Sequence, residues 1–328
     1  MIDEMDSDER GMTRILVTGA SGFVGRAVVR AFAGSGRTVR AAVRRSPPES
    51  FPAGVETVVH PDLAQSFDWS PYLDGVAQVI HLAGIAHTGG VAAEHYERVN
   101  HAATAELAAA AARHGIHHFV FVSSIRAQSG PSADHALTEH DEAQPTDAYG
   151  RSKLAAEVAV RESGVPFTIL RPALFYGPGV KGNFALLLRA ARSRAPLPVK
   201  DFVNRRSLIG IDNFISALDF VLSSPTTLGE TYVVADPGIP PRLGDLIATL
   251  RKAQGRRPLL LPLPPHYLET PLRLLRRKGM WERIGGNLRI DPEKLIGAGW
   301  QPLHDTRDGL TALVETLTHA VKDKRGPK

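Results

Sequence analysis

Tyr149 and Lys153 have the residue types and the spacing that suggest proton transfer. They stand four positions apart, about one helical turn, so their side chains would share a helix face. A free tyrosine, with a pKa of about 10, is a poor base near neutral pH. A neighbouring ammonium favours the phenolate and lowers that pKa. We expect Tyr149 to exchange a proton with a substrate hydroxyl or carbonyl while Lys153 tunes it.

A serine pair, Ser123 and Ser124, follows the apolar run 119–122, which reads as a strand. Ligand sites in open α/β sheets lie at the carboxyl ends of strands. A serine hydroxyl there could hold the reacting oxygen of a substrate. We favour Ser124 over Ser123 because it lies further out of the strand.

A glycine-rich motif at 18–25 follows a β-rich run at 14–17 and opens an apolar-periodic stretch at 23–32. Glycines in this context let the backbone turn sharply and approach a pyrophosphate at the helix N-terminus. The motif predicts a dinucleotide site formed by Gly19, Ser21, Gly22, Phe23, Val24 and Gly25.

The second predicted strand, 38–43, ends at Arg44 and Arg45, where a carboxylate would be needed to accept from a ribose 2′-hydroxyl. Arginines could hold a 2′-phosphate instead, so the sequence favours NADP(H) and leaves NAD(H) open. The alternative is that both arginines point into solvent. Asp62 and Leu63, after the third strand, are placed to touch the adenine, although Asp62 could also be an ordinary turn residue.

Strand and helix signals alternate along the first half of the chain. Strands are expected at 14–17, 38–43, 55–59, 77–82, 119–122 and 167–170, and helices at 94–113 and 148–162. This order predicts an α/β fold of the Rossmann type, a doubly wound parallel sheet.

After residue 172 prolines and glycines interrupt the pattern. We expect a dinucleotide-binding domain at 13–172 with a return segment at 205–236. A smaller, mixed C-terminal substrate domain would comprise 173–204 and 237–320, with short helices after 240. The active site would lie between the two domains.

The composition excludes several classes of protein. The 328 residues carry a formal net charge of +5 and no cysteine, which removes disulfides, thiolate catalysis and Cys-ligated metals. Neither a signal peptide nor a membrane span is apparent, so we expect a cytoplasmic protein. The basic excess suits an anionic small molecule, and no nucleic-acid motif accompanies it. We expect residues 1–12 to be disordered and the basic segment 271–283 to be a solvated helix face rather than a membrane-surface helix.

No metal site is expected. His114, His117 and His118 cluster at a helix–strand junction without further ligands at sensible spacing, so an exposed turn is the simpler interpretation.

Taken in order, these motifs resemble the extended short-chain dehydrogenase/reductase superfamily, and within it the NAD-dependent epimerase/dehydratase family, whose members act mostly on nucleotide sugars. The resemblance runs from about residue 13 to residue 300 and includes residues 81–84, Asn100 and 170–172. It implies that the cofactor site also includes Leu82, Ala83, Gly84, Asn100, Tyr149 and Lys153. Lys153 would also bond the nicotinamide ribose.

Three further segments, at 123–126, 176–184 and 205–213, resemble bacterial surface-polysaccharide enzymes that are 4-epimerases or 4-ketoreductases of UDP-N-acetyl sugars. The resemblance implies that Arg206 contacts the substrate diphosphate and that Asn183 lies near the nucleotide sugar, with Ser124 at the reacting oxygen. For Arg206 a surface salt bridge is the alternative.

Two departures from the family narrow the expected reaction. No carboxylate follows Ser124 at 125–127, which argues against dehydration, and Phe175 replaces a common asparagine. We expect NAD(P)-dependent 4-keto reduction or C4 epimerisation of a nucleoside-diphosphate sugar. The alternatives are an NADPH-dependent reductase of a non-sugar ketone or aldehyde and a non-catalytic NADP-binding sensor. A homodimer stays open.

Overall fold

The computed structural model describes residues 13–46, 49–86, 90–180, 182–267, 270 and 285–323. The lead-in at 1–12 and the basic segment 271–283 lie outside these described residues. The chain divides into two compact units. Unit 1 comprises Met1–Gln128, Glu142–Arg171 and Ala217–Tyr232, and unit 2 comprises Ser129–Asp141, Pro172–Ser216 and Val233–Lys328.

A seven-stranded sheet organises the first part of the chain, in the order β10-β7-β5-β4-β1-β2-β3. Every neighbouring pair from β7 through β3 is parallel. The predicted Rossmann-type doubly wound sheet is therefore confirmed. Its strands are β1 (Ile15–Thr18), β2 (Val39–Val43), β3 (Glu56–Val59), β4 (Gln78–His81), β5 (His118–Val122), β7 (Phe167–Pro172) and β10 (Thr231–Val234).

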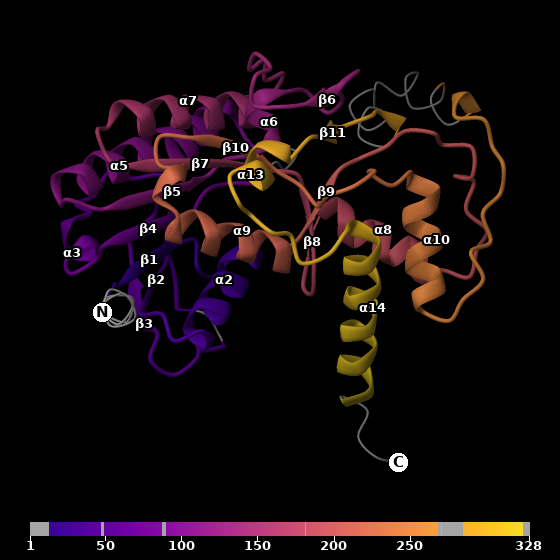
Figure 1. Cartoon of the computed structure of the whole chain (residues 1–328), viewed down its shortest axis with the longest axis horizontal. Coiled ribbons are helices and arrows are strands. Elements are labelled where there is room, and N and C mark those ends of the chain that lie inside the picture. Colours follow the sequence, from indigo (N-terminus) through magenta and orange to yellow (C-terminus); the bar gives the residue numbers. More distant parts are fainter. Residues whose placement is uncertain are drawn as a thin grey trace. The chain divides into compact units, whose positions relative to one another are not determined.

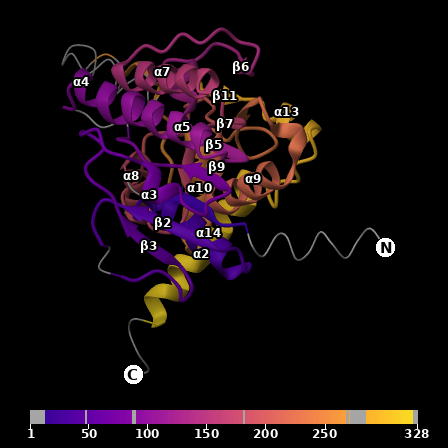
Figure 2. The ribbon, with the colours of Figure 1, turned by 90° about the vertical axis from the view of Figure 1, so that its left-hand side faces the viewer.

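Helices cover both faces of this sheet. In Figure 1, α5 and α7 lie above the strands and α2 lies below them, and the turned view in Figure 2 agrees. One core cluster joins Phe119 and Ile169 of the sheet to Leu107 of α5 and Val160 of α7. The helices are α2 (Phe23–Gly34), α3 (Ser70–Leu73), α4 (Ala93–Tyr96), a π-helical turn (Glu97–Ala102), α5 (Ala103–Arg113), α6 (Ile125–Gln128) and α7 (Ala148–Glu162).

The strand register brings the sequence motifs to one edge of the sheet. Thr18, the last residue of β1, lies opposite Ala42 of β2 and His81 of β4. His81 in turn lies opposite Phe121, near the end of β5. The segments that follow these strands therefore leave the sheet side by side, because carboxyl ends of parallel strands share an edge.

Unit 2 is built on a smaller apolar core in which α8, α10 and α14 meet around Phe184, Leu246, Leu250 and Leu310. At 18 residues, α14 is longer than the short helices expected for this region. Two short parallel pairs complete the unit, β8 (Leu174–Tyr176) with β9 (Leu208–Gly210) and β6 (Ala136–Leu137) with β11 (Arg289–Ile290). Among the described residues of the second half of the chain, the helices include α8 (Gly182–Arg192), α9 (Ile211–Ser223), a 3-10 turn (Pro225–Thr227), α10 (Leu243–Ala253), α13 (Glu293–Gly297) and α14 (Thr306–Asp323).

None of the helices among the described residues is long and apolar enough to cross a membrane.

The histidine cluster is only partly the exposed turn that we expected. His118 is buried at the start of β5, where its ring bonds the hydroxyl of Thr168 at 2.8 Å. Burial lowers its pKa to about 4, so this ring is neutral at physiological pH.

Candidate active site

The glycine motif forms a tight turn between β1 and α2. Gly19 has a φ of +67°, and a Cβ there would lie 2.7 Å from the backbone nitrogen of Ala83. A Cβ at Gly25 would lie 2.2 Å from the carbonyl oxygen of Gly19. Glycine is therefore required at both positions for close backbone approach. Ser21 is exposed on this turn.

The N-terminus of α2 is suited to an anion. The helix begins at Phe23, which is followed by Val24, and its N-cap residue is Gly22. It has no side-chain cap and no acidic residue in its first turn. Backbone N–H groups at such an end attract phosphate. The residues present therefore fit the pyrophosphate of a dinucleotide.

A buried chain of hydrogen bonds ties this turn to the loop after β4. The backbone N–H of Ala83 donates to Thr18 Oγ1 at 3.3 Å, and Thr18 Oγ1 lies 2.7 Å from His81 Nδ1. His81 Nε2 lies 2.9 Å from Thr104 Oγ1, which donates to the carbonyl of Asn100 at 2.7 Å. Burial and the charge of Lys153 lower the pKa of His81 to about 3, so its imidazole is neutral within this series of hydrogen bonds.

Asn100, in the π-helical turn, holds the β4 loop from its other side. Its Oδ1 accepts from the backbone N–H of Ile85 at 2.7 Å, and its Nδ2 donates to the Ile85 carbonyl at 3.1 Å and to Ser152 Oγ at 3.2 Å. Gly84 has a φ of +153°, and a Cβ there would lie 2.8 Å from Asn100 Oδ1. The loop with Leu82, Ala83 and Gly84 is thereby fixed against α7.

Arg44, which directly follows β2, lies beside Asp62, which lies in the turn after β3. Arg44 Nη1 is 3.5 Å from Asp62 Oδ2, and both side chains are exposed, at 65% and 46%. Such a pair contributes little to stability and yields readily to a stronger ligand. The side chain of Leu63 is buried in the core cluster of unit 1.

Ser124 and Tyr149 are brought together by a side-chain hydrogen bond. Ser124 follows β5, and Tyr149 lies in the first turn of α7, with its ring 5.8 Å from that of Tyr96. Burial raises the pKa of Tyr149, and the Ser124 hydrogen bond opposes that rise only in part.

In the chain alone the pKa of Tyr149 is raised and not lowered, and the tuning role of Lys153 stays a prediction. Lys153 Nζ donates to the carbonyl oxygen of Val122 at 3.0 Å and lies 4.8 Å above the ring of Phe121. Burial lowers the pKa of Lys153 to about 8, and the nearby Glu157 carboxylate opposes this. A bond to a strand carbonyl cannot be foreseen from helical spacing.

Glu157 anchors a buried network that the sequence reasoning missed. It accepts from Arg171 through both oxygens, at 2.9 and 2.6 Å, and from Ser123 Oγ at 2.6 Å. Arg171 also donates to Gln128 Oε1 at 3.0 Å. The hydroxyl of Ser123 therefore faces the interior, while that of Ser124 meets Tyr149. The signal was present as a glutamate one helical turn after Lys153.

In unit 2, Arg206 is half-buried. Its Nη1 donates to the carbonyl oxygens of Pro131 at 3.1 Å and Gly286 at 3.0 Å. Asn183 lies in the first turn of α8.

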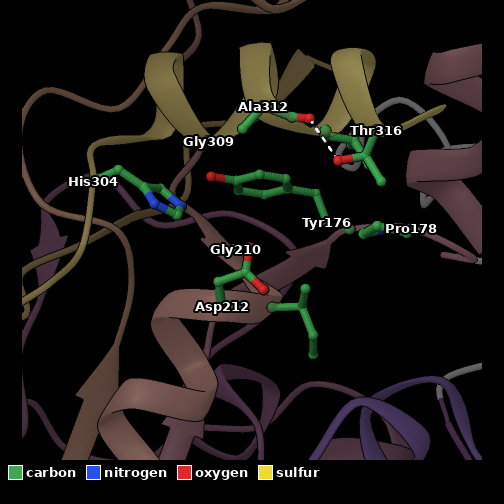
Figure 3. A pocket seen from close by; sticks show the side chains of 11 residues that line it. Tyr176, Pro178, Gly210, Asp212, His304, Gly309, Ala312 and Thr316 are labelled. Atoms are coloured by element: carbon green, nitrogen blue, oxygen red, sulfur yellow. Dashed lines mark hydrogen bonds between the residues drawn. The ribbon is translucent and has the colours of Figure 1, made fainter. Parts of the chain in front are cut away.

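A small pocket in unit 2 surrounds Tyr176 (Figure 3). The phenol donates to Asp236 Oδ2 at 2.8 Å, and burial raises its pKa, so it stays protonated. A Cβ at Gly309 of α14 would lie 2.0 Å from the Tyr176 hydroxyl, so α14 can pack this close to Tyr176 only with a glycine at that position. These contacts are those of a packed core.

Comparisons with known proteins agree with this arrangement. Residues 15–235 match the NAD dependent epimerase/dehydratase family. The UDP-glucose 4-epimerase of Vibrio cholerae is 30% identical over 333 residues, covering 96% of this chain and 99% of that protein. The ceramide reductase of Caulobacter vibrioides is 35% identical over 262 residues, covering 79% of this chain and 76% of that protein.

Solved structures share the fold. The UDP-glucuronic acid 4-epimerase from Bacillus cereus, in complex with UDP-glucuronic acid and NAD, superposes with a TM-score of 0.74 at 21% identity, covering 94% of this chain and all of that one. MoeE5, in complex with UDP-glucose and NAD, gives 0.75 at 24% identity, covering 94% and 99%. With its Rossmann sheet and a family match over two thirds of its length, the chain belongs to the NAD-dependent epimerase/dehydratase family of extended short-chain dehydrogenase/reductases.

Proposed function

We propose that this chain catalyses an NAD(P)-dependent reaction at C4 of a nucleoside-diphosphate sugar, either epimerisation or reduction of a 4-keto group. The observation that carries the proposal is the hydrogen bond between Ser124 and Tyr149 at the end of β5. Two hydroxyls in contact can address one carbinol or carbonyl oxygen at a time. No carboxylate stands at 125–127 to eliminate water across two carbons.

In this proposal Tyr149 is the acid–base group. The bound dinucleotide supplies the redox chemistry at the substrate carbon. As the phenolate, Tyr149 would take the proton of the substrate hydroxyl as the carbonyl forms, and as the phenol it would give a proton to the oxygen of a 4-keto group that is reduced. Ser124 holds the same oxygen and fixes its distance from the phenol. Lys153, bonded to the Val122 carbonyl, places a positive charge at the end of β5 and would also bond the cofactor's ribose.

NADP(H) is the favoured cofactor, with NAD(H) admitted. Arg44 stands where a carboxylate would read a free 2′-hydroxyl, and its exposed partner, Asp62, holds it only weakly. A 2′-phosphate can pair with the guanidinium in bidentate fashion and displace that contact.

The diphosphate of the substrate is assigned to Arg206 and the sugar environment to Asn183, both in unit 2. The name of the Vibrio cholerae relative, a UDP-glucose 4-epimerase, supports a UDP-sugar and the C4 position.

The experiment is turnover with two kinds of substrate. Purified protein is incubated with UDP-glucose and UDP-GlcNAc in the presence of NAD, and separately with a UDP-4-keto-6-deoxy-N-acetylhexosamine and NADPH. A 4-epimer in the first or NADPH oxidation in the second supports the proposal. No binding of any nucleotide sugar, together with turnover of a plain ketone, overturns it.

A second candidate function is reduction of a non-sugar ketone with NADPH. The specific support is the ceramide reductase relative, at 35% identity over 262 residues. The same Ser124, Tyr149 and Lys153 would serve that reaction. A long-chain 3-keto lipid offered with NADPH, beside the nucleotide sugars, separates the two.

A further inference from the structure

An ion pair between Arg126 of α6 and Asp147 flanks Tyr149. The two side chains are in direct contact, and they are only 16% and 27% exposed. Asp147 is the N-cap of α7, and its Oδ1 accepts from the backbone N–H of Gly150 at 2.8 Å. Tyr149 therefore lies in the sequence between Asp147, whose carboxylate caps the helix, and Gly150, whose N–H donates to that carboxylate.

Arg126 is tied to the other hydroxyl as well. Its backbone N–H donates to Ser124 Oγ at 3.2 Å. A Cβ at Gly150 would lie 2.2 Å from the Arg126 carbonyl oxygen, so α6 and α7 touch through backbone at this point. The contacts close a ring through Ser124, Arg126, Asp147, Gly150 and Tyr149. Any displacement of the ion pair would move the Ser124–Tyr149 hydroxyls.

The charges around Tyr149 come from three elements. The Arg126 guanidinium favours the phenolate, whereas the Asp147 carboxylate and the Tyr96 phenol of α4 disfavour it. The Ser124 hydrogen bond also favours the phenolate, and burial opposes it most strongly. Lys153, on the same helix, donates a hydrogen bond to the carbonyl oxygen of Val122. The low exposure of the ion pair keeps solvent from screening its two charges.

We propose that Arg126 and Asp147 are positioning residues that hold the Tyr149 phenol against Ser124 and place one positive and one negative charge beside it. The proposal rests on the acid–base role given to Tyr149 above. It adds that the guanidinium of Arg126 offsets part of the cost of burying the phenolate.

The test measures the ionisation of residue 149 directly and needs no substrate. A 3,5-difluorotyrosine is incorporated at position 149 of the full chain, since its more acidic phenol titrates while the protein is folded. Its ¹⁹F NMR shift is followed against pH. Arg126→Gln should raise the pKa of this phenol, and Asp147→Asn should lower it, each by about half a pH unit. The double variant should fall between the two.

Opposite directions are the decisive feature, because both single variants break the same ion pair. If the pair served packing alone, both would shift the pKa in the same direction or leave it unchanged, and either result overturns the proposal. Arg37→Gln is the matched control: Arg37 pairs with Asp219 and is 21% exposed, and its loss should leave the pKa unchanged. If the shifts appear but no nucleotide sugar is turned over, only the proposed substrate fails.

Discussion

Lys153 Nζ lies 3.0 Å from the carbonyl oxygen of Val122, so the ammonium of α7 is bonded to the last residue of β5. Both partners are buried. The bond joins the helix that carries Tyr149 to the strand that presents Ser124. It holds a charged group in a place where burial disfavours the charge, and this has a measurable consequence for stability.

Stability should rise with pH through the titration of Lys153. Burial lowers its pKa to about 8, whereas in the unfolded chain it titrates near 10.5. Between these values the unfolded state binds more protons, so the free energy of unfolding increases with pH. Relative to Lys153→Met, the wild type should gain about 1 to 2 kcal/mol between about pH 7 and about pH 9.5. Urea unfolding at several pH values measures this gain. A difference that stays constant with pH would contradict the assigned direction.

Tyr149→Phe should lower kcat by about a hundredfold to ten-thousandfold, because the phenol is the proton donor and acceptor. The fold should survive, since the ring stays in place and loss of the Ser124 hydrogen bond costs about 1 kcal/mol. Steady-state kinetics, dinucleotide titration and thermal unfolding separate these effects. Tyr72→Phe, which removes a phenol that donates to the Val59 carbonyl and leaves Tyr149 in place, is the control. Substantial turnover by Tyr149→Phe would remove this residue from the mechanism.

Arg44→Ala should weaken NADPH binding by about tenfold to a hundredfold and leave NADH binding nearly unchanged, because only NADPH carries a 2′-phosphate for the guanidinium to bind. Asp62→Asn should act in the opposite direction on NADPH, since it frees Arg44 from its exposed partner. Fluorescence titration of both nucleotides checks the two variants. Tighter binding of NADH than of NADPH by the wild type would sink the cofactor preference.

Glu157→Gln should destabilise the fold by about 3 to 5 kcal/mol, because it leaves Arg171 buried with a lost partner. Ser123→Ala removes one bond to the same carboxylate and should cost about 1 kcal/mol. Glu106→Gln, in the more exposed pair with Arg98, should cost less than about 1 kcal/mol. Urea unfolding ranks the three. Equal losses in the free energy of unfolding for Glu157→Gln and Glu106→Gln would show that the Glu157 network does not stabilise the fold more than an exposed pair does.

Much of the sheet could be predicted from local sequence. The expected helix at 148–162 and the strand end at Val122 agree with the structure because a continuous periodic or apolar run sets each of them. The two-residue pair β6 and β11 was not predicted. Its paired residues, such as Ala136 and Arg289, lie 153 positions apart, and short strands of this kind depend on long-range pairing rather than on their own residues.

The candidate site was predictable in its residues and not in its contacts. Ser124 follows β5, and Tyr149 lies in the first turn of α7, whose Gly150 packs on the backbone of Arg126 just after that strand, so the two side chains meet. The partner of Lys153 and the upward shift of the Tyr149 pKa depend on burial, which arises only when α7 packs on β5. Spacing along a helix carries no information on that packing.

The most direct test of the proposed function asks which C–H bond of the sugar is broken. The protein is incubated with its nicotinamide cofactor and UDP-glucose or UDP-GlcNAc carrying deuterium at C4, and in parallel at C3. Mass spectrometry then follows the label in the dinucleotide and in the sugar. If the reaction is epimerisation, the proposal predicts that deuterium passes from C4 to the nicotinamide ring and back, so that the 4-epimer keeps its label at C4 and none leaves C3. If it is reduction, a UDP-4-keto sugar given NADPH deuterated at the nicotinamide C4 should take up deuterium at sugar C4. Tyr149→Phe should abolish either result. Label leaving from C3, or neither result while a plain ketone is reduced, would contradict the proposal.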